Sequence, residues 1–132
     1  MSVPSPAFSR ERSGDTLIVV PHGNLFRYRE DELRGGYNDI YRLLDDTRNQ
    51  NFLVDCIDVD HFGSTFIAIL CQLCQKVRRA GGQAALCGLP EDMLKSLMLL
   101  ERNNKTAFYW DTYGNRAEAL AALASDSPSA GE

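Results

Sequence analysis

The chain has 132 residues and a formal net charge of −4, with 44% hydrophobic and 24% charged residues. This length fits a single domain with one ordinary core, and the composition is that of a soluble globular protein. The negative charge argues against nucleic acid as the main partner, because binding phosphates requires a positive surface. No apolar segment reaches the ~20 residues that span a bilayer, so we expect no membrane partner. The N-terminus lacks the apolar core of a secretory signal, which predicts a cytoplasmic protein.

The first elements in chain order are a strand and a helix. The segment DTLIVVPHG predicts a strand that stops at Pro21 and Gly23. A short strand near Phe8 would join it through a hairpin turn at residues 13–15. Between Glu30 and Asn49 the apolar residues recur at spacings of three and four, which predicts one amphipathic helix.

The remainder of the chain alternates between strands and helices. In order, the expected elements are strand NFLVDCIDV, helix 64–80, strand QAALCGL, helix 90–100, strand TAFYWDTY and helix 115–124. Such alternation requires crossover connections and therefore parallel strands. The predicted fold class is α/β: one domain over residues 7–124, with a mixed, mostly parallel sheet of four to five strands flanked by about four helices. Residues 1–6 are expected to be flexible and residues 125–132 disordered.

Four cysteines, Cys56, Cys71, Cys74 and Cys87, lie within apolar runs. Cysteine in such runs usually packs as a small hydrophobic residue in a reducing compartment. The Cys71-x-x-Cys74 spacing allows a redox or metal site, but its context is helical and has no second cysteine pair. We therefore expect helix packing, with no metal and no cofactor.

Two adjacent hydroxyl residues, Ser64 and Thr65, follow Gly63 where a strand gives way to a helix. One hydroxyl is explained as a helix cap, worth ~1 kcal/mol. A phosphate on either residue would lie at the positive end of the helix, where free N–H groups favour it. These two residues are therefore candidates for a phosphorylation switch.

From about Asp15 to Ala124 the chain resembles a STAS domain, the fold of anti-sigma factor antagonists. That family has a strand, a turn of Asp-Ser-Ser-Gly-Leu-Gly type, a helix ending in Gly-Gly and a further strand. Here the turn reads Gly63-Ser64-Thr65-Phe66-Ile67-Ala68, and the alignment reaches Gly81-Gly82 without a gap. Gly63 stands where the family turn has its acidic residue, and Phe66 and Ala68 stand where it has two glycines.

The resemblance implies a signalling module without catalytic residues that binds an anti-sigma factor, itself a serine/threonine kinase. Thr65 takes the place of the phosphorylated hydroxyl, and Ser64 precedes it. The implied partner-binding residues are Asp60, His61, Phe62, Gly63, Phe66 and Ile67. For Phe62 and Phe66, outward contact and burial against the sheet both remain open.

Other functions and states stay open at this point. A STAS-like scaffold without phosphorylation, or a small-ligand sensor, is the alternative function, and a homodimer is also left open. A receiver domain would use Asp55, Asp58 or Asp60, but the expected first strand is followed by no carboxylate for Mg²⁺. The only two histidines, His22 and His61, stand apart in the sequence, and a Ser/His/Asp site is recognised by geometry that a sequence does not supply.

Overall fold

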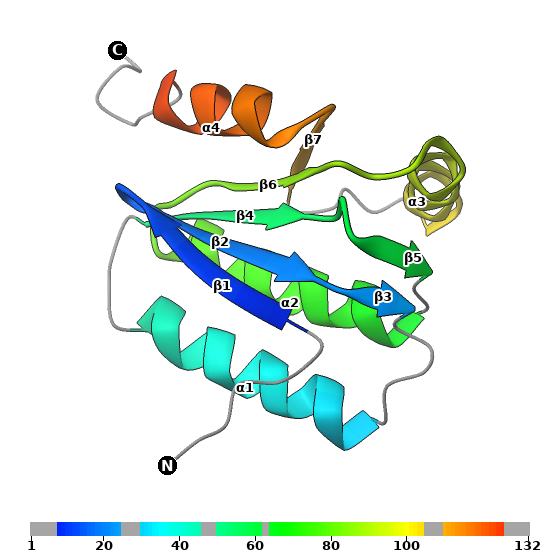
Figure 1. The fold of residues 1–132 in the computed structure, drawn as a ribbon, viewed down its shortest axis with the longest axis horizontal. Coiled ribbons are helices and arrows are strands. Elements are labelled where there is room, and N and C mark those ends of the chain that lie inside the picture. Colours follow the sequence, from blue (N-terminus) through cyan, green and yellow to red (C-terminus); the bar gives the residue numbers. More distant parts are fainter. Residues whose placement is uncertain (1–7, 25–29, 46–49, 62–63, 105–109, 126–132) are drawn as a thin grey trace.

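The computed structural model describes residues 8–24, 30–45, 50–61, 64–104 and 110–125. Figure 1 shows the arrangement of the elements. In chain order they are β1 (Phe8–Ser13), β2 (Thr16–Pro21), β3 (Gly23–Asn24), α1 (Glu30–Asp45), β4 (Asn51–Asp55), β5 (Val59–His61), α2 (Ser64–Arg79), β6 (Ala84–Cys87), α3 (Glu91–Asn104), β7 (Asp111–Tyr113) and α4 (Arg116–Ser125).

Five strands form the main sheet, in the order β1-β2-β4-β6-β7. Strand β1 is antiparallel to β2, while β2, β4, β6 and β7 are parallel to their neighbours. This is the mixed, mostly parallel α/β sheet that the alternation of elements predicts, and the expected hairpin at residues 13–15 is confirmed. Two short strands, β3 and β5, pair in parallel as a separate ribbon beyond the main sheet.

The central strands are buried on both faces. Helices α1 and α2 cover one face, and α4 covers the other (Figure 1). Alternate residues of β2, β4 and β6 point into the two layers, which explains why these strands read as continuous apolar runs. The layer toward α1 and α2 contains Leu17, Val19, Phe52, Val54, Ala84 and Leu86, and the layer toward α4 contains Ile18, Val20, Leu53, Ala85 and Cys87.

The strand expected over residues 51–59 is interrupted, which corrects the prediction. Strand β4 ends at Asp55, whose Oδ1 accepts a hydrogen bond from the main-chain N–H of Ile57 at 3.2 Å. The main-chain N–H of Val59 then bonds back to the carbonyl of Cys56 at 3.0 Å. This turn redirects the chain into β5, away from the main sheet.

Other boundaries differ more modestly. Helix α1 already begins at Glu30 and includes Gly35 and Gly36, while residues 46–49 lie outside the described part. Helix α3 continues four residues past Leu100 to Asn104. Strand β7 begins only at Asp111, and residues 105–109, including Phe108 and Tyr109, lie outside the described part.

Two glycines shape the end of α2. Gly81 has φ 94°, a left-handed conformation that glycine adopts without a steric penalty. The main chain at Gly82 lies very close to Gln50, the residue before β4. A Cβ at Gly82 would lie 1.9 Å from the carbonyl oxygen of Gln50 and 3.0 Å from Cγ1 of Val77. The Gly-Gly pair is thus required by both the turn and the packing.

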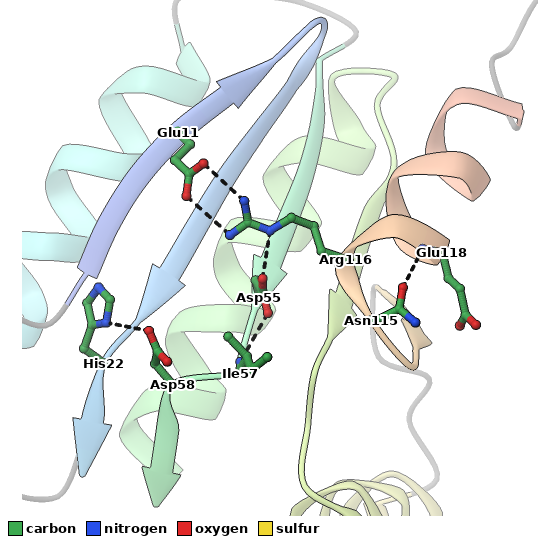
Figure 2. Close-up of polar contacts among 8 residues, drawn as sticks. All are labelled: Glu11, His22, Asp55, Ile57, Asp58, Asn115, Arg116 and Glu118. Atoms are coloured by element: carbon green, nitrogen blue, oxygen red, sulfur yellow. Dashed lines mark hydrogen bonds and ion pairs between the residues drawn. The ribbon is translucent and has the colours of Figure 1, made fainter.

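One arginine spans the sheet face under α4. Arg116, the first residue of α4, donates from Nε to Oδ2 of Asp55 at 2.8 Å and from its two terminal nitrogens to the Glu11 carboxylate at 3.1 and 3.3 Å (Figure 2). The side chain of Asp55 is only 7% exposed, whereas that of Glu11 is 52% exposed. Arg116 therefore neutralises a nearly buried carboxylate and joins α4 to the edge strand β1.

Replacing Gly82 by alanine is expected to lower the free energy of unfolding by about 1–3 kcal/mol, the usual cost of forcing extra atoms into a packed site. Urea unfolding of the two proteins measures the change. Gly35→Ala is the matched control: Gly35 lies in α1, and nothing lies within 4 Å of the position that an added methyl group would occupy. Its substitution should raise stability by about 0.5–1 kcal/mol through helix propensity. Equal effects at both glycines would contradict the close approach at Gly82.

Removing the guanidinium with Arg116→Met is expected to cost about 1–3 kcal/mol, because a nearly buried carboxylate loses its charged partner. Lys95→Met is the control, since the Lys95–Glu91 pair is 71% and 82% exposed and should contribute less than about 0.5 kcal/mol. Adding Asp55→Asn to Arg116→Met should restore part of the loss, because the unpaired charge is then gone. A double variant with fully additive losses would show that Asp55 and Arg116 do not interact.

Candidate functional site

The candidate site lies at the carboxyl end of the parallel strands, where β4 leads into β5 and α2 begins (Figure 1). In parallel α/β sheets the carboxyl ends of the strands meet at one edge, so loops and helix N-termini gather there. The sequence motif with two hydroxyls occupies this edge. Its helix begins at Ser64, as the pattern predicts.

The start of α2 favours negative charge. Ser64 and Thr65 form its first two residues, and the N–H groups of a first helical turn have no partner within the helix. The first turn contains no acidic residue, while Lys76, Arg78 and Arg79 lie in the last turn. The helix dipole is therefore not offset by a carboxylate in this turn. The side chains of Ser64 and Thr65 lie outside the described part, as do Phe62 and Gly63.

The remaining predicted contact residues separate into two groups. Asp60 and His61, on β5, are exposed, and Ile67 is half-buried against the core. Phe66 is only 2% exposed, and its ring stacks on Phe8 with 6.4 Å between the centroids. Phe66 is therefore buried, and the prediction that it contacts the partner directly is wrong.

The three aspartates near this edge have different environments. Asp55 is buried and ion-paired with Arg116, so it is not available as an acceptor of a phosphoryl group. Asp58 contacts His22, with 3.3 Å between Oδ2 and Nδ1 (Figure 2). Asp60 is exposed on β5. Of these three carboxylates, Asp60 is the nearest in sequence to the start of α2.

The cysteines have the environment of packing residues. All four are free thiols, and Cys56, Cys74 and Cys87 are buried. Burial raises the pKa of Cys56 and Cys74, and burial together with the neighbouring Asp55 raises the pKa of Cys87 to about 12. Burial also raises the pKa of Cys71, so the Cys71-x-x-Cys74 pair is poorly suited to thiolate chemistry. Among the described residues, no group of three or more His, Cys, Asp or Glu side chains is placed to hold a metal ion.

One polar cluster escapes the sequence patterns. Ser9 Oγ lies 2.5 Å from Nε2 of His22, and Nδ1 of the same ring contacts Asp58. Ser9 lies on β1, His22 lies between β2 and β3, and Asp58 lies in the turn after β4. The only sequence signal for the cluster is the predicted hairpin, which would bring Ser9 on β1 near His22, just after β2.

In the part of the chain that the structure describes, no helix has both the length and the apolar composition needed to cross a membrane.

The fold is shared with solved structures of low sequence identity. An anti-sigma-factor antagonist (STAS) domain protein from Planctomyces limnophilus superposes with a TM-score of 0.70 at 20% identity, covering 89% of this chain and 97% of that chain. An anti-sigma factor antagonist from Mycobacterium paratuberculosis gives 0.63 at 16% identity, covering 92% and 99%. The Bacillus cell fate determinant SpoIIAA in its phosphorylated form gives 0.66 at 12% identity, covering 89% and 99%.

No curated protein sequence matches the chain. The family model of the STAS domain, however, matches residues 7–119, which include the sheet, the two-hydroxyl turn and the start of α4. The protein therefore belongs to the STAS domain family.

Proposed function

We propose that this protein is an anti-sigma factor antagonist that binds an anti-sigma factor, itself a serine/threonine kinase, through the edge around β5 and the start of α2. Phosphorylation at Thr65, or failing that at Ser64, ends the binding. The protein itself catalyses no step of this cycle. Asp60, His61 and Ile67 are the described residues that we assign to the interface, and Phe62 and Gly63 belong to the same proposed surface.

The family and its relatives support this assignment. The anti-sigma factor antagonist SpoIIAA has been solved in an unphosphorylated form, which superposes on this chain with a TM-score of 0.67, and in a phosphorylated form with a TM-score of 0.66. Both forms thus match this chain about equally well. A domain of this fold can accept a phosphate without a change of architecture.

The observation that carries the proposal is the position of the two hydroxyl residues on the fold. Ser64 and Thr65 are the first residues of a 16-residue helix whose first turn contains no acidic side chain. A phosphate adds a charge of about −1.5 to −2 at pH 7. The N–H groups of the first turn and the helix dipole would stabilise that charge, so the domain would tolerate the modification.

The same charge would oppose docking. Asp60 is exposed on the strand that leads into this helix, so a phosphate would add to an existing negative charge. A partner whose contact surface here is acidic or apolar would have to face or desolvate both anions. Like charges brought together in an interface are strongly unfavourable, and this repulsion would release the partner.

Thr65→Asp is expected to weaken binding of the cognate kinase at least tenfold, which corresponds to about 1.4 kcal/mol, because a carboxylate reproduces part of the phosphate charge. Thr65→Ala should bind like the wild type and remain bound when ATP is added. Isothermal titration with the kinase recovered from the native cell measures both effects. Mass analysis of the peptide containing Ser64 and Thr65 identifies the modified residue.

Ser13→Asp is the matched control. Ser13 ends the exposed strand β1 at the hairpin, at the opposite end of the sheet from the start of α2 (Figure 1). The Ser13→Asp variant adds the same charge as Thr65→Asp and should leave the affinity for the kinase unchanged. Equal affinities of wild type and Thr65→Asp, with no phosphate on Ser64 or Thr65 after incubation with kinase and ATP, would refute the switch.

A further inference from the structure

Ser9, His22 and Asp58 form a linear arrangement of hydroxyl, imidazole and carboxylate. Ser9 Oγ lies 2.5 Å from His22 Nε2, and His22 Nδ1 lies 3.3 Å from Asp58 Oδ2. We propose that this cluster activates Ser9 as a nucleophile that takes an acyl group from a small activated ester or thioester. Ser9 would be the nucleophile, His22 the base and Asp58 the positioning residue.

The main chain holds these three residues in place. Ser9 pairs with Val20 across the β1–β2 hairpin, and His22 lies two residues beyond Val20, so both side chains lie on one face of the sheet. On the other side, the N–H of Gly23 donates to the carbonyl of Asp58 at 2.7 Å. The residues next to His22 and Asp58 thus lie in the β3–β5 ribbon, where Gly23 pairs with Val59. The cluster therefore does not depend on side-chain contacts alone.

The neighbours of the His22 ring favour one arrangement of its protons. An ionised aspartate can only accept a proton, so a neutral ring that carries its proton on Nδ1 places that proton toward Asp58. Nε2 then carries the lone pair, and the hydroxyl of Ser9 donates its proton to it. In this tautomer the base faces the hydroxyl that it would deprotonate, which is the relation that a serine nucleophile requires.

The cluster is open to a ligand. Ser9 is exposed, and the side chains of His22 and Asp58 are 36% and 57% exposed. In the proposed step, a bond forms between Ser9 Oγ and the acyl carbon as the bond from that carbon to the leaving oxygen or sulfur breaks. The hydroxyl proton passes to His22 Nε2 and then to the leaving group or to water. The product is a serine ester, and no oxidant, metal or further reactant is needed.

The expected rate of acylation at Ser9 follows from the groups present in the cluster. A positioned general base contributes about 10²–10⁴-fold. Because water screens this exposed cluster, we expect the lower end of that range. Ser9 should therefore react at least tenfold faster than an exposed serine that has no imidazole beside it.

The test is to incubate the full chain with p-nitrophenyl acetate near pH 7.5 and to map acetylated residues by mass spectrometry over time. We expect acetylation of Ser9 at least tenfold faster than of Ser13, which is exposed on the same strand and on the same face. Treatment with hydroxylamine should remove the label, because it cleaves esters and leaves acetylated lysines intact. Ser9→Ala should remove the fast ester signal and leave only slow labelling such as that of Ser13, and His22→Gln should reduce labelling at Ser9 to the rate of Ser13.

Two measurements separate activation from a structural bridge. Lowering the pH should slow labelling of Ser9 more than labelling of Ser13, because a protonated imidazole accepts no proton. Asp58→Asn should slow labelling of Ser9 while leaving the urea unfolding curve near that of the wild type. Labelling of Ser9 and Ser13 at equal rates, or labelling of Ser9 that is unaffected by His22→Gln, would overturn the proposal. Either result leaves the assignment of Thr65 untouched, because the two sites share no residue.

Discussion

The carboxylate of Asp55 determines the geometry at the carboxyl end of the sheet. It accepts a hydrogen bond from the N–H of Ile57, and this bond turns the chain out of β4. It also accepts a hydrogen bond from the guanidinium of Arg116, which fixes the start of α4. Asp55 also pairs with Cys87 across the β4–β6 ladder, which joins β6 to the same residue. A carboxylate this deeply buried is stable only when charged and polar partners surround it. Three separate segments are therefore joined at one residue.

The turn after Asp55 has consequences for both proposed sites. Because β4 stops there, β5 leaves the main sheet and pairs with β3. This pairing carries the chain past His22 and then directly into α2. Asp58, within the turn, lies beside His22, whereas Asp60, two residues later, lies on the strand that leads to Ser64. One local deviation from the sheet thus supplies both the cluster of Ser9, His22 and Asp58 and the approach to the two-hydroxyl turn.

The sequence predicted the elements well because the signals for them are local. The β-branched run before Pro21 and the spacing of apolar residues in α1 and α2 depend only on nearby residues, and both were confirmed. The break of the strand at Cys56 was not predicted, because the apolar run continues past it and because the burial of Asp55 at the turn is compensated by Arg116, 61 residues distant. The sheet face on which each helix lies was likewise undetermined by periodicity.

The site was predicted less completely than the fold. The helix start at Ser64 followed from the pattern, but the orientation of Phe66 did not, since an aromatic residue near a helix start fits either a core or a contact surface. The stacking of Phe66 on Phe8 decides it, and that contact joins residues 58 positions apart. His22 appeared isolated because its neighbours are brought in by the hairpin register and by the β3–β5 pairing. Long-range pairings of this kind leave no local mark in a single sequence.

The departures from the family turn bear on how a switch would act here. Phe66 and Ala68 replace two glycines of the family pattern, and each is inside α2. Glycine costs up to ~1 kcal/mol relative to alanine within a helix, so Ala68 strengthens the first turns. Phe66 adds a buried ring that anchors the same turn to β1. The start of α2 is therefore set by packing before any modification occurs. A phosphate at this position would change the charge of a surface that already exists, and repulsion of the partner needs no refolding of the domain.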